Sequence, residues 1–283
     1  MGHRQSRLTS FFKLSASFAA TLAIAIAAFS QEPDLTGPVP LYSSIKTDMF
    51  PPEWMEKPIF AKAVPLDQEE TERSLAMAKK AVKKYPEAIL KTNLKKVFLV
   101  KSLNFFGQPY GGTNSLDTIY LCNDGKRRGY TDAYLEKCFH HEFSSILLRN
   151  FYTTFPTKKW TDVNPKDFKY LGDGLMALQQ SKSSIVYNSE LYAKGFLTTY
   201  SQASVEEDFN MIVEGMFSGN PAYWQAIDSS AKLKAKCSIA IDFYHRLDPW
   251  FTEDRFRGFV EKSAGLGAPS IPRIETPRVY AVR

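Results

Sequence analysis

Two adjacent residues, His141 and Glu142, could bind a metal ion and act as a general base, and they lie in the helical stretch CFHHEFSSILLRNF (138–151). In an H-E-x-x-H helix the two histidines are four residues apart, so they share one face and bind one zinc ion beside the glutamate. Here the position of the second histidine is Ser145. A serine hydroxyl is a poor zinc ligand compared with histidine, cysteine or a carboxylate. The motif therefore supplies only part of a zinc site.

A second candidate lies further along the chain, in YSQASVEEDFNMIVEGMF (200–217). A catalytic zinc takes three protein ligands, and in one class of zinc peptidases one of them is a glutamate on a later helix. Glu207, at the start of a strongly amphipathic segment, has the type and order of that ligand. The same residue also fits a capping box with Ser204, in which its carboxylate folds back onto the helix start. The sequence leaves both interpretations open.

Two residues are candidates to replace the missing histidine ligand. Cys138 precedes His141 by three residues and shares its helix face, and His245 could approach through the fold. His140 points about 100° away from His141 on a helix of about 3.6 residues per turn, so it cannot replace the ligand. A disulfide between Cys122 and Cys138 also stays open, and it would exclude Cys138 as a ligand.

The elements that must position these residues follow an α+β order, with strands first and then almost only helices. Two runs rich in β-branched and aromatic residues, within 95–107 and 116–122, are expected in one sheet, as a hairpin or as two of its strands, joined by a Gly-Gly turn at 111–112. The expected helices are 67–85, a short turn at 86–92, one beginning at Thr131 or Asp132, then 175–182, 189–199, one through 209–217, 223–247 and 253–262.

The N-terminus has the pattern of a secretory signal peptide. Residues 1–30 combine a basic start, an apolar run at 14–29 and small residues before Gln31. The run is short for a membrane span, so we expect cleavage, export to the periplasm or the cell exterior, and no stable membrane span afterwards. Seven prolines predict an extended strap or linker over 31–66. We expect the main domain over 67–264 and a C-terminal tail over 265–283.

The charge balance argues against one class of partner. Without residues 1–30 the chain keeps 33 basic and 30 acidic side chains, a formal charge of +3. The basic cluster Lys126-Arg127-Arg128 follows the turn residues Asn-Asp-Gly and is interpreted as a solvated loop. We therefore expect no nucleic-acid partner.

The order of a TIYL strand, a His-Glu helix and Y-x6-E-D-F on a later helix resembles the zinc-binding metallopeptidases of the gluzincin type, in particular the lethal-factor-like group. In that group the second helix reads E-x-F-A-E, and a tyrosine seven residues before its first glutamate donates to the oxyanion. Tyr200 precedes Glu207 by seven residues, and Phe209 matches the motif's phenylalanine. The resemblance covers roughly residues 95 to 220.

The resemblance implies a zincin-like domain with a small N-terminal sheet, an active-site helix and a mostly helical C-terminal half. It implies Zn²⁺ as cofactor, with His141 and Glu207 as ligands, Glu142 as general base and Tyr200 as transition-state donor. It also implies that the strand through 119–121 is an edge strand that pairs with an extended peptide or protein substrate.

Two positions depart from the family pattern, because Ser145 replaces the second histidine and Met211 replaces the second glutamate of E-x-F-A-E. Loss of the imidazole is the more serious change, since it removes a metal ligand. Three hypotheses follow. The chain is a zinc metallopeptidase with a modified site, a pseudoprotease that binds a peptide or protein without hydrolysis, or an exported structural protein in which His141 is a core residue and Glu207 a helix cap.

Overall fold

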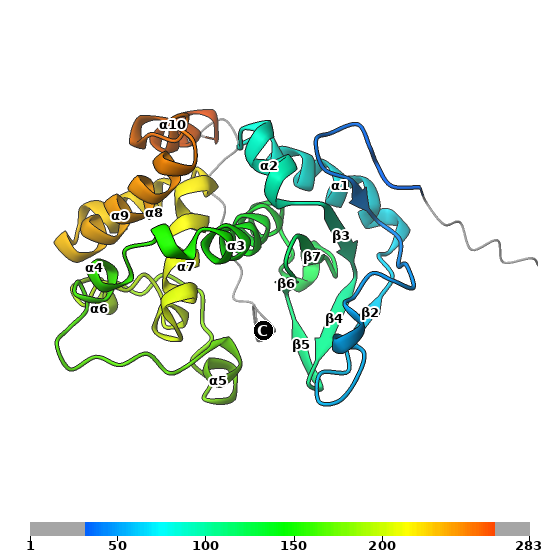
Figure 1. Cartoon of the computed structure of the whole chain (residues 1–283), viewed down its shortest axis with the longest axis horizontal. Helices are drawn as coiled ribbons and strands as arrows, with labels where there is room; N and C mark the ends of the chain where they lie inside the picture. The colour runs from blue at the N-terminus through cyan, green and yellow to red at the C-terminus, as the bar shows by residue number, and fades with distance from the viewer. Residues whose placement is uncertain (1–31, 264–283) are drawn as a thin grey trace, which may run out of the picture. The chain divides into compact units, whose positions relative to one another are not determined.

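The computed structural model describes residues 32–263, so the expected signal peptide (1–30) and C-terminal tail (265–283) lie outside the described residues. Within this range the strands come first and helices dominate afterwards, which confirms the α+β class (Figure 1). No helix in residues 32–263 is long and apolar enough to cross a bilayer.

Four strands form the sheet beside the candidate site. They lie in the order β1 (Leu41–Tyr42), β3 (Lys96–Val100), β7 (Thr118–Cys122) and β6 (Gly112–Asn114). β1 and β7 run parallel to β3, and β6 returns antiparallel to β7. Both faces of β3 and β7 are covered, which explains why these two strands are almost continuous apolar runs in the sequence.

A second, antiparallel sheet has the order β2 (Lys62–Val64), β4 (Ser102–Phe105) and β5 (Gln108–Tyr110). Residues before β2 pack against it, and the Trp54 ring meets the Phe105 ring edge-on at 5.5 Å. The predicted strap, 31–66, thus contributes a strand to each sheet in its described part. It contains no α-helix there, in line with its proline content.

The connection expected between the two long strands is wrong, although both strands lie in one sheet. β3 and β7 are parallel, and Gly112 begins β6 instead of turning the chain between them. One tight turn is at Phe106-Gly107, between β4 and β5, where both φ angles are positive (54° and 73°), as a two-residue hairpin turn requires. The expected edge strand is also wrong: residues 119–121 belong to β7, which lies between β3 and β6, so the edge strand on this side of the sheet is β6.

The helices dominate the second half of the described chain. Their bounds are α1 (Gln68–Val82), α2 (Glu87–Asn93), α3 (Asp132–Asn150), α4 (Thr157–Thr161), α5 (Gly174–Gln179), α6 (Ser189–Tyr192), α7 (Val205–Ser218), α8 (Pro221–Asp228), α9 (Ala231–Leu247) and α10 (Glu253–Ser263).

Capping residues account for several helix boundaries. Thr131 caps α3 as expected, because its hydroxyl accepts a hydrogen bond from the Tyr134 amide at 3.2 Å. The helix expected over 189–199 ends early, and Gly195 follows it with a left-handed φ of 91°. The helix expected over 223–247 is two helices, and Ser230 caps the second of them.

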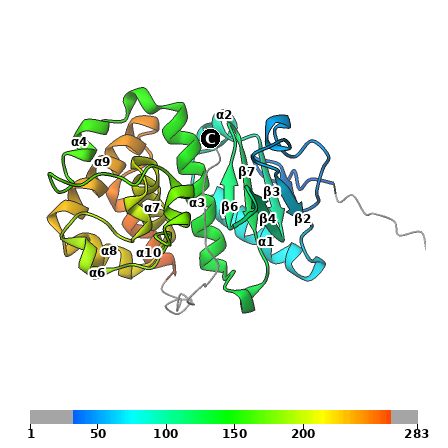
Figure 2. The ribbon, with the colours of Figure 1, turned by 90° about the horizontal axis from the view of Figure 1, so that it is seen from below.

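α3 is the central helix, between the strands on one side and the helices α7 to α10 on the other (Figure 2). Its residues from Tyr134 to Leu148 are all buried, although several are polar or charged. A helix buried on all sides is normally apolar throughout. The buried polar groups of α3 therefore need partners from the neighbouring elements, and these partners build the candidate site.

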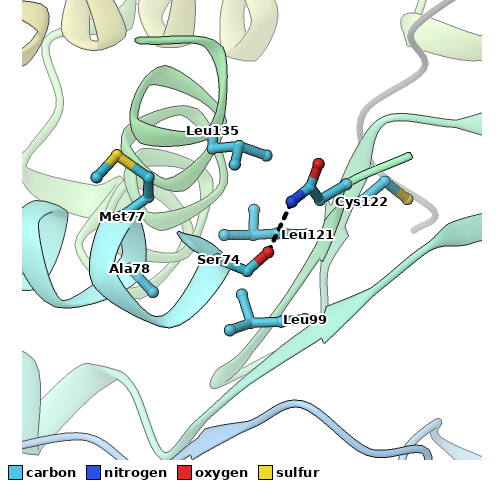
Figure 3. A pocket seen from close by; sticks show the side chains of 8 residues that line it. Ser74, Met77, Ala78, Leu99, Leu121, Cys122 and Leu135 are labelled. Carbon is cyan, nitrogen blue, oxygen red and sulfur yellow. Dashed lines mark hydrogen bonds between the residues drawn. The ribbon is translucent and has the colours of Figure 1, made fainter. Parts of the chain in front are cut away.

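A small cavity lies between α1, α3 and the sheet (Figure 3). Its volume is about 10 Å³, and one wall carries a hydrogen bond of 2.7 Å from the Asn123 amide to the Ser74 hydroxyl. This space is close to the minimum for a single water molecule. The cavity is too small to be a ligand pocket.

Candidate functional site

The contact between α3 and α7 brings the two predicted metal ligands together. Nε2 of His141 lies 3.0 Å from a Glu207 oxygen, and Nδ1 of the same ring lies 3.0 Å from a Glu214 oxygen. The other oxygen of Glu214 is 2.6 Å from Nζ of Lys137. Spacing explains the arrangement, since residues 137 and 141 are about one helical turn apart and 207 and 214 about two turns. These four side chains form a buried chain of charges.

The two carboxylates determine the protonation of the imidazole between them. Burial by itself lowers the pKa of His141, but hydrogen bonds to Glu207 and Glu214 and their charges raise it to about 10. Burial raises the pKa of Glu207, opposed by His141 and by a hydrogen bond from Tyr200. The Tyr200 ring stacks near that of His141, with ring centres 6.3 Å apart. Tyr200 therefore lies at the same cluster as the two predicted ligands.

Glu207 lies at the capped start of α7, but its carboxylate is directed to His141. The Ser204 hydroxyl accepts a hydrogen bond from the Glu207 backbone amide at 3.1 Å and so caps α7. The Glu207 side chain contacts His141. The structural hypothesis required His141 and Glu207 to lie far apart, so the 3.0 Å distance between them contradicts it.

Glu142 lies on the side of α3 that faces β6. One of its oxygens accepts a hydrogen bond of 2.7 Å from the Asn114 amide, and Asn114 in turn accepts one from Arg149. The other oxygen, Oε1, is buried and has no hydrogen-bond partner in the described part of the chain. A Cβ at Gly112 would lie 2.9 Å from it, so the close approach of strand and carboxylate favours glycine there. Burial, with smaller contributions from Glu207 and other charges, raises the pKa of Glu142 to about 8.

Ser145 occupies the position of the missing histidine and is already bonded. Its hydroxyl accepts a hydrogen bond of 2.7 Å from the amide of Asn210 on α7. Oδ1 of Asn210 accepts one of 2.5 Å from Ser144, and Nδ2 lies 3.4 Å from Nε2 of His141. All of these side chains are buried.

Neither candidate replacement completes a metal site. His245 lies near the end of α9, where its Nδ1 is 2.9 Å from the Phe251 carbonyl oxygen. Cys138 belongs to the apolar core, and neither it nor Cys122 forms a disulfide. His140 also points elsewhere: its Nδ1 is 2.9 Å from the Tyr85 hydroxyl. In residues 32–263 no three His, Cys, Asp or Glu side chains are arranged to hold a metal ion.

The donor set therefore does not fit a catalytic zinc site of the usual kind. Such a site takes three strong protein ligands, and His141 and Glu207 provide two. The third position offers the hydroxyl of Ser145 and the amide of Asn210, which hydrogen-bond each other. No reaction step through zinc follows from this arrangement.

Sequence reasoning missed four residues of this cluster: Lys137, Glu214, Asn114 and Asn210. One signal was available, because Glu214 lies seven residues after Glu207 on the same helix, and Lys137 lies four residues before His141. Charged residues at those spacings share a helix face with a predicted ligand. Asn114 and Asn210 had no such signal, since an asparagine in a strand or helix does not indicate its tertiary partner.

The raised pKa of Glu142 predicts a pH effect on stability. The folded protein holds this proton between about pH 4.5 and about pH 8, whereas the unfolded chain releases it, so rising pH in that window lowers the free energy of unfolding. Glu142→Gln imitates the protonated acid. We expect its unfolding free energy relative to the native protein to rise by about 4 kcal/mol between pH 5 and pH 9.

Urea denaturation at several pH values measures this difference, with Glu53→Gln as the same substitution at an exposed position. A gap between native protein and Glu142→Gln that stays constant with pH would contradict the assigned protonation.

One comparison with known proteins bears on the class expected from the sequence. A family model described as "Putative zinc-binding metallo-peptidase" matches residues 112–246. The matched segment begins at β6 and includes the His-Glu helix, Tyr200 and the α7 motif. It supports the class of zinc-binding metallopeptidases for this part of the chain. No curated protein matches the chain.

One solved structure is similar to this chain. It is the crystal structure of a protein described as a "putative zinc-binding metallo-peptidase" from Bacteroides caccae. The two chains are 16% identical, the match covers 75% of this chain and 83% of the other, and the TM-score is 0.44.

Proposed function

We propose that this chain is an exported member of the zinc-binding metallopeptidase family that binds an extended peptide along β6 without hydrolysing it through zinc. The family match supports the metallopeptidase class, and the signal-peptide pattern of residues 1–30 supports export. The donor set, with two of three zinc ligands, favours binding over hydrolysis. The observation that carries the proposal is the outer edge of β6 and its position beside Glu142.

β6 has backbone groups directed away from its partner strand. The Cys122 amide donates to the Gly111 carbonyl and the Ser115 amide to the Thr118 carbonyl. In an antiparallel ladder such hydrogen-bonded pairs alternate with pairs that are not bonded. The amide and carbonyl groups of residues 112 and 114 therefore face the outer side of β6. Within residues 32–263 no strand pairs with that side.

Unpaired strand edges and buried polar atoms both need a hydrogen-bonding partner. Oε1 of Glu142, beside β6, is buried and has no hydrogen-bond partner among residues 32–263. A peptide strand supplies amides and carbonyls at the spacing that such an edge requires. With its pKa at about 8, the Glu142 carboxyl is protonated at neutral pH and can donate to a peptide carbonyl.

Peptide binding by strand addition has a specific signature. Peptides selected from a random library on the purified protein are resynthesised unmodified, with N-methyl groups on odd residues, or with N-methyl groups on even residues. Only alternate amides of an added strand face the sheet, so one pattern is expected to weaken binding about tenfold or more and the other to have little effect. Calorimetric titration measures the three affinities.

Two substitutions at Asn114 distinguish the contribution of its backbone amide to peptide binding from that of its side chain. Asn114→Pro removes an outward amide, whereas Asn114→Ala keeps it and removes only the side chain. We expect the proline variant to bind more weakly than the alanine variant. Equal effects of both methylation patterns would mean that the peptide does not bind as a strand.

The mass of the bound peptide after long incubation tests the absence of hydrolysis. We expect an intact peptide. Cleavage that Glu142→Gln abolishes would assign peptidase activity to this site and overturn the proposed function.

A further inference from the structure

We infer that Ser145 and Asn210 are a matched pair that replaces a zinc-binding histidine with a metal-free hydrogen-bonded bridge between α3 and α7. This inference does not depend on peptide binding at β6, because it concerns only the contact between the two helices. It follows from the partners of the Asn210 amide and from the residues that the family motif has at positions 145 and 210.

Both the amide nitrogen and the amide oxygen of Asn210 form hydrogen bonds with side chains of α3. Nδ2 donates to the Ser145 hydroxyl at 2.7 Å, and Oδ1 accepts from the Ser144 hydroxyl at 2.5 Å. Ser144 also lies within 2.8 Å of the backbone carbonyl of His141. The exposed fraction is 0% for Asn210 and Ser144 and 1% for Ser145. A buried amide satisfied at both ends is stable in place, whereas the same amide without its partners would be costly.

The two positions also compete for space. The motif E-x-F-A-E has alanine where this chain has Asn210, and H-E-x-x-H has histidine where it has Ser145. An imidazole at 145 would extend well beyond the serine hydroxyl, which already contacts the Asn210 amide at 2.7 Å. Protein interiors have little spare volume, so histidine at 145 requires a small residue at 210. The motif has the large residue at 145 and the small one at 210, whereas this chain has the small one at 145 and the larger one at 210.

The bridge closes the side of the cluster where a third ligand would lie. The Asn210 amide is 3.4 Å from Nε2 of His141, the atom that also faces Glu207. Lys137 pairs with Glu214 at the opposite side of the ring. Direct side-chain contacts therefore connect α3 to α7: Lys137 with Glu214, His141 with Glu207, and Ser145 with Asn210. A metal ion whose ligands come from two helices would connect the helices in the same way.

Metal content distinguishes this arrangement from a modified zinc site. Native protein, Ser145→His, Asn210→Ala and the double variant Ser145→His/Asn210→Ala are loaded with zinc, desalted and analysed by plasma mass spectrometry. We expect near-stoichiometric zinc only in the double variant, with an affinity at least about tenfold higher than that of Ser145→His alone. Zinc should raise the thermal unfolding midpoint of the double variant and leave that of the native protein unchanged.

Glu207→Gln in the double variant is the control for location, and it should remove the bound zinc. Native protein that carries near-stoichiometric zinc and loses it with Glu207→Gln would overturn the inference. Equal zinc affinity of Ser145→His and the double variant would also overturn it, as would a folded double variant that binds no zinc.

A double-mutant cycle tests the bridge without any metal and without histidine at 145. Ser145→Ala and Asn210→Ala each leave the other side chain without its partner, so their combined effect on the urea midpoint should be smaller than the sum of the single effects. Additive effects would show that the pair is not coupled and would overturn the inference even if the histidine variants fail to fold.

Discussion

A Glu214→Ala variant is expected to lose about 3–5 kcal/mol of unfolding free energy, because it leaves a buried lysine without its carboxylate. Lys137 is only 7% exposed, and its Nζ is 2.6 Å from Glu214. Burial lowers the pKa of Lys137, but the Glu214 carboxylate outweighs burial and raises it above its ordinary value. The variant also removes the partner of Nδ1 of His141. Urea denaturation followed by circular dichroism measures the loss.

Two further variants test this explanation. Lys137→Met in the Glu214→Ala background removes the unpaired charge and should restore more than half of the loss. Glu87→Ala breaks the exposed pair of Glu87 and Lys91 and should cost less than about 1 kcal/mol. A Glu214→Ala protein no less stable than Glu87→Ala would contradict a buried chain of charges between α3 and α7.

Asp208→Ala is expected to cost a similar amount, about 3–5 kcal/mol, at a second buried ion pair. One Asp208 oxygen accepts hydrogen bonds from Lys236 at 2.5 Å, from Tyr170 at 2.7 Å and from the Trp160 indole at 3.0 Å. Lys236 is fully buried and also donates to the Gly195 carbonyl at 2.8 Å. Without Asp208 this ammonium group has no carboxylate partner in the described structure.

The position of Asp208 extends the effect to the candidate site. It follows Glu207 directly on α7, and its partners Tyr170 and, through Lys236, Gly195 belong to the segment that leads to Tyr200. We therefore expect faster amide hydrogen exchange in residues 165–203 of Asp208→Ala under native conditions.

Asp162→Ala is the matched control, since it removes the same residue type from an exposed lysine pair at 2.7 Å. It should change the stability by less than about 1 kcal/mol. A comparable loss in Asp162→Ala and Asp208→Ala would show that burial does not determine the effect.

The order of elements was largely predictable, because helix and strand signals are local. Thr131 caps α3 as its sequence position indicates, and α7 follows its apolar spacing. The errors concern relations between elements. Whether two strands are hairpin partners or parallel neighbours depends on where the intervening chain goes, and here it forms β4, β5 and β6 between β3 and β7.

The candidate site divides in the same way. The resemblance to the family motifs implied that His141, Glu142, Tyr200 and Glu207 belong together, and the structure places His141, Glu207 and Tyr200 at one cluster. It did not predict the second carboxylate on His141, Glu214, because the rotation of α7 against α3 determines which of its residues faces the imidazole.

Local residue patterns predicted most of the helices, the Thr131 cap, the apolar face of α7 and the incomplete ligand set, since these depend on residue types and on neighbours within a few positions. That β6 is an edge strand and that Ser145 is bonded to Asn210 follows only from the packing of distant elements. These two residues are 65 positions apart, and their contact exists only because α3 and α7 pack together. No local pattern carries that information, because hydrogen bonding between distant side chains depends on the packing of whole elements.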